Sequence, residues 1–213
     1  LGKDWISQPV GHALGMAVHE SQSLFVEMQL CRSKVFIKYL LPLIKRHFKD
    51  QPGLTANNLF SLATRVKPSL IRVDADEATY PLHVILRYNI EKQLLNGSLS
   101  VADLPECWDQ HMQQYLGLST LGNDRNGVMQ DVHWPSGAFG YFPSYTLGRI
   151  IAAQLFDAMR AALPNLNHQL EAGKFDAVNA WLRDNIHSQA SSLNACELIE
   201  QATGEALNPN YFL

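Results

Sequence analysis

A histidine, a glutamate and a glutamine stand close together near the start of the chain and could take part in metal chemistry. They belong to the segment His19-Glu20-Ser21-Gln22, which has apolar residues on both sides. A carboxylate is costly to bury without a partner, and a metal ion or another cation is the usual partner. The segment is therefore compatible with a metal ligand at Glu20. An ordinary helical glutamate with local hydrogen bonds is the commoner explanation of such a pattern.

A second group of chemically capable side chains lies between Gly127 and Tyr145, where histidine, tyrosine and acidic residues alternate with glycines. Glycines allow the backbone to approach a ligand closely. Asp131 precedes His133 by two residues, and an acid at that spacing can orient an imidazole in the fold. Histidine and tyrosine are also usual donors to a developing oxyanion. The alternative is an aromatic loop that only fills a core.

A third candidate is Arg72, which stands beside the acids Asp74, Asp76 and Glu77. The acids need no further explanation, because carboxylates at the start of a helix interact favourably with its dipole. The planar guanidinium of Arg72 suits a carboxylate such as the C-terminus of a peptide. A salt bridge from Arg72 to one of the three neighbouring acids is the competing interpretation, and taken alone it is the simpler one.

A complete zinc site is absent from the sequence. A helical metallopeptidase centre needs the pattern HExxH, which places two imidazoles one turn apart on the same metal ion. No two of the eight histidines are four residues apart, and Ser23 occupies the position where the second histidine would follow His19. The sequence also lacks a glycine-rich phosphate loop, a GxSxG elbow and a convincing cysteine nucleophile.

The elements that must position these residues are predicted to be helices almost throughout. The apolar spacing predicts helices over about 14–48, 55–65, 74–95, 100–117, 144–163, 175–187 and 196–203. Pro42 should bend or break the first of these, and Pro81 indicates either a kink or a helix that begins near it. Residues 118–143 lack helical periodicity and are expected to form a long irregular loop, with a β-hairpin left open. The fold class is mainly α with little or no β.

Composition excludes several classes of function. The net charge of −3 gives no basic surface for nucleic acid, and no segment approaches the apolar length of a membrane span. Cys31, Cys107 and Cys196 are widely spaced, which suits reduced and mostly buried thiols of a cytoplasmic protein. Leu1 is not an initiator methionine, so we expect it to be an internal position of a longer chain.

Taken together, these segments resemble the M32 family of metallocarboxypeptidases, the carboxypeptidase Taq type. HESQ stands at 19–22, GxxQDxHW at 127–134 and GYFPxYxLG at 140–148. Further similarity extends over Ile71–Glu77, Asp103–Glu106 and Trp181–His187, so that the resemblance covers essentially the whole chain in order. The family's HExxH, HPF and DxRxT motifs lie upstream of HESQ and are absent here.

The resemblance implies a helical gluzincin-like fold and a catalytic Zn²⁺, with Co²⁺ as an alternative metal. It also implies stepwise release of C-terminal residues from peptides with broad specificity, a cytoplasmic location and a homodimer. By motif match, Glu20 is the third zinc ligand, and Arg72 holds the C-terminal carboxylate of the substrate. The resemblance implies that His133 and Tyr141 stabilise the transition state. It further implies that Tyr145 and Gln130 bind the substrate. The residues implied to support the metal ligand and the catalytic groups are His19, Gln22 and Asp131.

Residues 1–213 are therefore expected to be the C-terminal helical portion of a single catalytic domain. Two metal ligands and the general base of HExxH are missing, so we expect the isolated chain to be inactive and not to hold zinc stably. The alternative is a non-catalytic helical module that binds peptides or dimerises.

Overall fold

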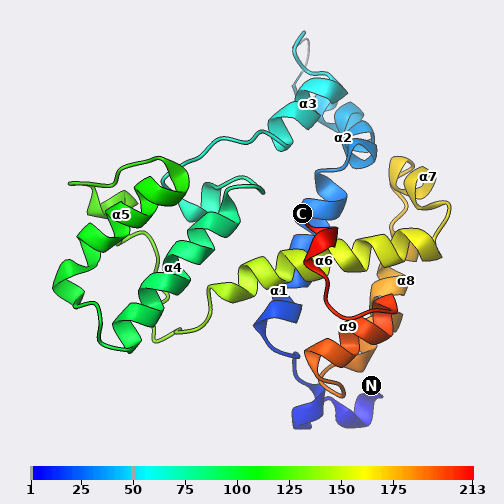
Figure 1. Cartoon of the computed structure of the whole chain (residues 1–213). Helices are drawn as coiled ribbons and strands as arrows, with labels where there is room; N and C mark the ends of the chain where they lie inside the picture. Colours follow the sequence, from blue (N-terminus) through cyan, green and yellow to red (C-terminus); the bar gives the residue numbers. More distant parts are fainter. Residues whose placement is uncertain (1, 49–50) are drawn as a thin grey trace. The chain divides into compact units, whose positions relative to one another are not determined.

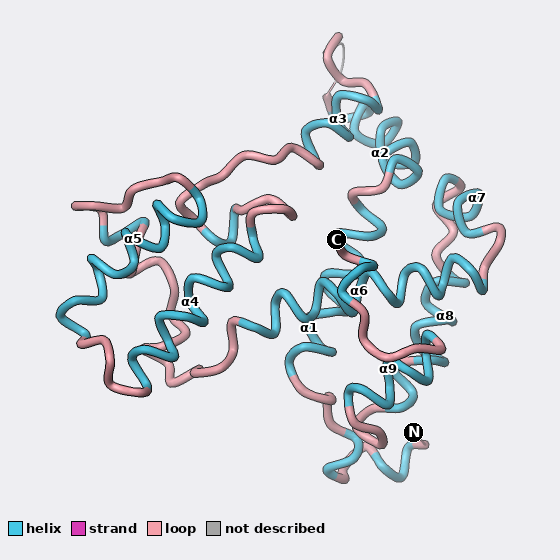
Figure 2. Tube along the Cα trace, viewed as in Figure 1, coloured by secondary structure: helices cyan, strands magenta, loops and turns pink. Residues whose placement is uncertain are grey.

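The computed structural model describes residues 2–48 and 51–213, and within them it contains helices and loops but no strand (Figure 2). The α-helices are α1 Met16–Leu24, α2 Lys34–His47, α3 Ala56–Ala63, α4 Tyr80–Leu95, α5 Leu104–Leu116, α6 Pro143–Ala162, α7 Leu166–Glu171, α8 Asp176–Asn185 and α9 Ala195–Thr203 (Figure 1). A π-helical segment, Phe25–Cys31, follows α1, and short 3₁₀ turns occur at Arg72–Asp74, Val101–Asp103 and elsewhere. The prediction of a mainly α fold is confirmed.

The chain divides into two compact units. The first comprises residues 1–63 and 147–213, and the second comprises residues 64–146. In the first unit, α6 forms the centre of a hydrophobic core that also receives side chains from α1, α7, α8 and α9. Ile151, Leu155 and Met159 of α6 are at most 2% exposed within this core. This packing positions the segment that contains Glu20.

The second unit is built on α4 and α5, which lie side by side (Figure 1). Leu86 and Ile90 of α4 pack against Trp108 and Met112 of α5, and these four side chains are almost completely buried. The loop between α5 and α6 runs along this pair, and Phe142 near the end of the loop is 1% exposed. The second unit therefore contains the loop in which most of the candidate site residues lie.

Local capping chemistry sets the helix ends that the sequence predicted correctly. Asn58 donates its backbone N–H to Thr55 Oγ1 at 3.2 Å at the start of α3. Ser100 Oγ accepts from Asp103 N–H at 3.3 Å in the 3₁₀ turn that leads into α5. Gly117 ends α5 with a φ of 67°, a left-handed value that favours glycine. Pro81 lies in the first turn of α4, so the helix begins near it, as one of the two alternatives stated.

The structure differs from the predicted first helix and decides the hairpin that the sequence left open. The predicted helix over 14–48 is interrupted, because Ser33 caps a new helix by accepting from Phe36 N–H at 3.1 Å. Pro42 lies inside α2, which continues to His47 without a break. No hairpin forms in 118–142, where this fully described loop consists of turns and a 3₁₀ segment.

Two further expectations concern the burial of the cysteines and the apolar length of the helices. Cys31 and Cys107 are partly buried, whereas Cys196 is exposed, contrary to the expectation for that residue. Over the described ranges 2–48 and 51–213, every helix is too short or too polar to cross a bilayer.

Candidate functional site

A buried ionic cluster occupies the centre of the second unit. Asp131 accepts hydrogen bonds through Oδ1 from Arg72 Nη2 at 2.7 Å and from Arg72 Nε at 3.1 Å. Its other oxygen, Oδ2, accepts from Arg87 Nε at 2.6 Å. The side chains of Arg72, Arg87 and Asp131 are 5%, 0% and 10% exposed. One carboxylate thus joins a residue of the Arg72–Asp74 turn to a residue of α4.

The electrostatics leave this cluster with an excess of positive charge. Burial alone would raise the pKa of Asp131, but the charge of Arg87 and the hydrogen bonds from Arg72 outweigh it and lower that pKa. Burial lowers the pKa of Arg87 to about 10, and burial likewise opposes the charge on Arg72, whose pKa is nevertheless raised by its hydrogen bonds to Asp131. All three groups are therefore charged at pH 7, and two cations face one anion.

The ion pair of Arg72 differs from the one favoured by the sequence. Arg72 bonds to Asp131, 59 residues away, and not to the neighbouring acids. Asp76 instead accepts hydrogen bonds from the backbone of Lys67 at 2.8 Å and Thr79 at 2.9 Å, which lowers its pKa despite the opposing effect of burial. Its position just before α4 agrees with the expected role of an acid at a helix start.

Gln130 connects the loop to the backbone at Arg72 and at Leu70, two residues before it. Its Oε1 accepts from Arg72 N–H at 2.8 Å, and its Nε2 donates to the carbonyls of Leu70 at 3.0 Å and Asn126 at 2.9 Å. These bonds fix the turn that carries Arg72 against the loop that carries Asp131.

His133, Tyr141 and Tyr145 form an aromatic group beside the ionic cluster. The Nε2 atom of His133 lies 3.0 Å from the hydroxyl of Tyr145, and the ring centroids of His133 and Tyr141 are 5.5 Å apart. The guanidinium carbon of Arg72 lies 4.8 Å from the ring centroid of Tyr145. Nδ1 of His133 is 3.8 Å from Asp131 Oδ1, beyond hydrogen-bond distance, so Asp131 serves mainly the two arginines. The second unit thus brings together Arg72, His133, Tyr141 and Tyr145.

The same loop also packs as an aromatic plug. Trp134 makes edge-to-face contacts with Trp108 at 6.4 Å and with Phe142 at 5.8 Å between ring centroids. Its indole N–H donates to Glu91 Oε2 at 2.8 Å. Both interpretations of the loop therefore hold for different side chains, because the tryptophan and phenylalanine fill the core while the polar group lies beside it.

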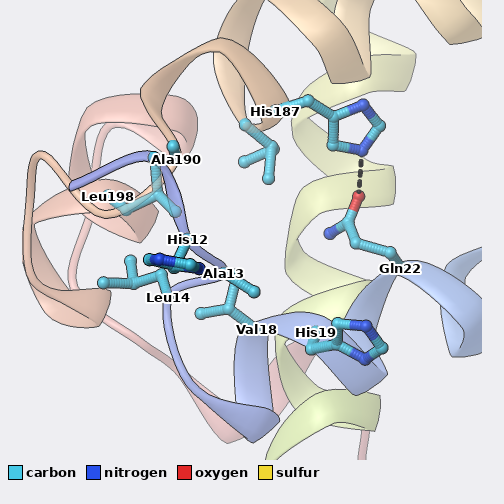
Figure 3. A pocket seen from close by; sticks show the side chains of 11 residues that line it. His12, Ala13, Leu14, Val18, His19, Gln22, His187, Ala190 and Leu198 are labelled. Atoms are coloured by element: carbon cyan, nitrogen blue, oxygen red, sulfur yellow. Dashed lines mark hydrogen bonds between the residues drawn. The ribbon is translucent and has the colours of Figure 1, made fainter. Parts of the chain in front are cut away.

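In the first unit, α1 places Glu20 partly buried, His19 exposed and Gln22 partly buried. Gln22 Oε1 lies 2.9 Å from His187 Nε2, and Figure 3 shows these two side chains facing each other at a pocket that His19 and Val18 also line. Across the described part of the chain, no three His, Cys, Asp or Glu side chains gather closely enough to hold a metal ion. Any metal site that uses Glu20 needs further ligands.

Comparisons with known proteins identify the family of the chain. The description of the matching family is carboxypeptidase Taq (M32) metallopeptidase, and the match extends over residues 1–213. This chain belongs to the M32 family of metallopeptidases. Carboxypeptidase 1 of Bacillus subtilis is 43% identical over 202 residues, which are 93% of this chain and 40% of that protein. Thermostable carboxypeptidase 1 of Thermus thermophilus is 39% identical over 213 residues, which are 100% of this chain and 42% of that protein.

Solved structures support the same M32 fold. Metallocarboxypeptidase 1 of Trypanosoma cruzi superposes with a TM-score of 0.93 and 46% identity, covering 99% of this chain and 44% of that one. An M32 carboxypeptidase of Deinococcus radiodurans also gives a TM-score of 0.93, with 36% identity, covering 100% of this chain and 43% of that one. The M32 chain described here spans about two fifths of the length of the curated relatives it matches.

Sequence reasoning missed a polar stripe on α4 of this M32 chain. His83, Arg87 and Glu91 are four residues apart from one to the next, so they share one face of the helix, and all three are buried. The signal was present, since charged residues at this spacing inside a largely apolar helix predict a buried polar network. Arg87 Nη1 donates to the carbonyl of His83 at 2.9 Å, whereas Glu91 accepts from Trp134 Nε1 at 2.8 Å.

His83 is expected to make the second unit sensitive to mild acid. Burial first, and then the charge of Arg87, lower the pKa of His83 to about 4, so the folded protein keeps it neutral. The unfolded chain takes up a proton on the same residue below its ordinary pKa of about 6.5. The free energy of unfolding should therefore fall by about 3 kcal/mol as the pH drops from 6.5 to 4, and urea unfolding at several pH values measures it. A His83→Gln variant should show a flatter profile over this range, and an unchanged slope would contradict the assignment.

Proposed function

We propose that the complete protein is a zinc carboxypeptidase that releases C-terminal residues from peptides with broad specificity. In this proposal the chain contributes one metal ligand, Glu20, and the part of the site that recognises the substrate. The observation that carries the proposal is the buried pair of arginines facing one carboxylate, with His133 and Tyr141 beside it, in a chain of the M32 family.

Arg72 is assigned to the C-terminal carboxylate of the substrate. A guanidinium binds a carboxylate through charge-assisted hydrogen bonds, and such pairs are stronger where water is excluded. Because Nε and Nη2 of Arg72 already donate to Asp131, the substrate carboxylate would use the remaining N–H groups of this side chain. The cluster of Arg72, Arg87 and Asp131 has one positive charge in excess, which the anionic end of a peptide would balance. Asp131 and Gln130 would act by holding the turn and the side chain of Arg72 in place.

Glu20 fits the requirements of a zinc ligand in part. It offers a partly buried carboxylate on a regular helix, and carboxylate oxygens are accepted zinc donors. The other donors would come from an HExxH sequence outside this chain. The bound metal would supply Lewis-acid polarisation of the scissile carbonyl. The isolated chain should accordingly contain little or no stoichiometric zinc and be inactive, which a metal analysis of the purified chain measures.

His133 and Tyr141 are assigned as hydrogen-bond donors to the oxyanion that develops on the scissile carbonyl. Donors that are already oriented stabilise such a charge without reorganisation during the reaction. The contact between Tyr145 and His133 Nε2 would fix the orientation of the imidazole. His19 and Gln22 flank Glu20 and would support it.

The test of these roles is a pair of substitutions in the full-length protein. His133→Gln and Tyr141→Phe should each lower kcat by about 10²–10³-fold with little change in KM, because each removes a donor used mainly in the transition state. The measurement is steady-state hydrolysis of an N-blocked peptide with a free C-terminal carboxylate. Tyr88→Phe is the matched control, since Tyr88 lies in the same unit and is 46% exposed. A kcat within threefold of the parent for both variants would refute the assignment.

The setting of the enzyme is also a proposal. We infer a single catalytic domain, a cytoplasmic location and a homodimer, with peptides as partners and no role for nucleic acid or membranes. The net charge of −3 is consistent with the absence of a nucleic-acid surface. Light scattering of the full-length protein measures the oligomeric state directly.

A further inference from the structure

We propose that Gly148 and His187 are positioning residues that hold the turn of α1 that carries Glu20 in place from two sides of this helix. The inference rests on the proposed function of Glu20 as a metal ligand. It concerns two residues to which that function gives no role. Both belong, with Glu20, to the first unit.

The first part of the argument is the close approach of α6 to α1 at Gly148. A Cβ atom at position 148 would lie 3.1 Å from Glu20 Cβ, 3.1 Å from Ser21 N and 3.1 Å from Leu24 Cδ1. These contacts are shorter than ordinary van der Waals contacts, and one of them is to backbone. Gly148 is buried within α6, where glycine is a poor helix former. Its missing side chain allows α6 to pack directly against the turn that carries Glu20.

The second part is a hydrogen bond on a different face of the same helix. Gln22 follows Glu20 by two residues, which is about 200° around a helix of 3.6 residues per turn. Its Oε1 lies 2.9 Å from Nε2 of His187, which directly follows Ile186 at the end of α8 (Figure 3). Its Nε2 donates to Ser21 Oγ at 3.0 Å, and that hydroxyl donates to the carbonyl of Val18 at 2.6 Å. The rotation of α1 about its axis is thus tied to the 3₁₀ turn His187–Gln189 that follows α8.

The two contacts together restrain both the distance and the rotation of the Glu20 turn. Metal ligands must be held within a few tenths of an ångström of their proper distance. A Cβ at position 148 would require a displacement of a few tenths of an ångström in α1. Loss of the His187 contact would instead leave α1 free to rotate about its axis. Residues that orient a metal ligand typically change metal affinity by about 10–100-fold when they are replaced.

The test measures zinc affinity of the full-length protein by competition with a chelator of known affinity. Gly148→Ala should weaken zinc binding by about 10–100-fold, and His187→Ala by about tenfold. His187→Gln should restore affinity to within about threefold of the parent, because its amide can donate to Gln22 Oε1 as the imidazole does. A merely structural role would lower the thermal midpoint of the metal-free protein together with its zinc affinity. The thermal midpoint of each metal-free variant is recorded alongside to separate ligand positioning from loss of folding.

The matched control is Gly53→Ala, which adds a Cβ that meets no atom closer than 4.0 Å and should leave zinc affinity unchanged. If Gly148→Ala and His187→Ala bind zinc as tightly as the parent while Glu20→Ala loses it, the positioning role is refuted and the ligand role stands. If Glu20→Ala keeps its zinc, the ligand role fails, and the positioning role fails with it. If Gly148→Ala does not fold, the two His187 variants decide the question. Weaker zinc binding in His187→Ala with recovery in His187→Gln supports the proposal. Unchanged zinc binding in His187→Ala refutes it.

Discussion

Replacing Glu20 with alanine in the full-length protein should abolish stoichiometric zinc binding and lower kcat/KM by about 10³-fold or more. A catalytic zinc ion of this type has three protein ligands, and the change would remove one ligand together with its negative charge. The metal contributes several kcal/mol of transition-state stabilisation, and each 1.4 kcal/mol corresponds to about a factor of ten in rate. Metal content after dialysis and steady-state hydrolysis of an N-blocked peptide measure the two effects.

Glu27→Ala is the matched control for this experiment. Glu27 lies one helical segment further along, its side chain is 55% exposed, and it pairs with Arg32 at 2.7 Å. An exposed pair of this kind contributes about 0–1 kcal/mol to stability. The control should keep both metal and activity. One zinc ion per chain in dialysed Glu20→Ala protein would show that the ligand is a different residue.

The helix ends could be predicted where a single residue determines them. Asn96-Gly97 after α4, Gly117 after α5 and Gly204 after α9 all have left-handed glycines that stop the helix, and each was readable from the sequence. These signals are local, so they do not depend on how the rest of the chain packs. The helix α7 was missed, because its six residues are too few for periodicity to register.

The interruption after α1 could not be predicted from apolar spacing. A π-helical segment adds a residue to a turn and shifts the register of the buried face. Phe25 and Met28 in this segment are 0% and 6% exposed, so the core of the first unit receives both side chains. Steps of three and four residues fit a continuous α-helix equally well, and only the tertiary packing distinguishes the two.

The sequence predicted that His133, Tyr141 and Tyr145 would lie together, but it predicted neither the ion pair of Arg72 nor the presence of Arg87 in the cluster. His133, Tyr141 and Tyr145 come from one short stretch, and the structure brings them together. The partner of Arg72 lies 59 residues away, and local spacing favoured the adjacent acids instead. The hydrogen bond between Gln22 and His187 joins residues 165 positions apart. Because it depends on the fold, the spacing of neighbouring residues in the sequence could not predict it.

Asp131→Ala should destabilise the second unit by about 3–5 kcal/mol, the largest stability change expected for any residue of the site. The substitution would leave Arg72 and Arg87, 5% and 0% exposed, without their shared counter-charge. Two like charges would then face each other in a medium of low dielectric constant. Hydrogen exchange of the amides of α4 measures the effect, since that helix belongs to the second unit. Protection that falls by less than 1 kcal/mol would contradict the prediction.

The comparison with a surface pair separates burial from charge. Asp184→Ala removes an ion pair with Arg183 whose side chains are 68% and 64% exposed, and it should change stability by less than about 1 kcal/mol.

The pH dependence of stability distinguishes the contribution of Asp131 from that of His83. Because the pKa of Asp131 is lowered in the folded protein, its contribution is present above its unfolded pKa of about 3.9 and is lost as the pH falls through the folded value. Asp131→Asn should therefore flatten the stability profile only below about pH 4, whereas His83→Gln flattens it between that pH and 6.5. Two neighbouring groups of one buried network would then be distinguished by the pH range in which each ceases to stabilise the fold.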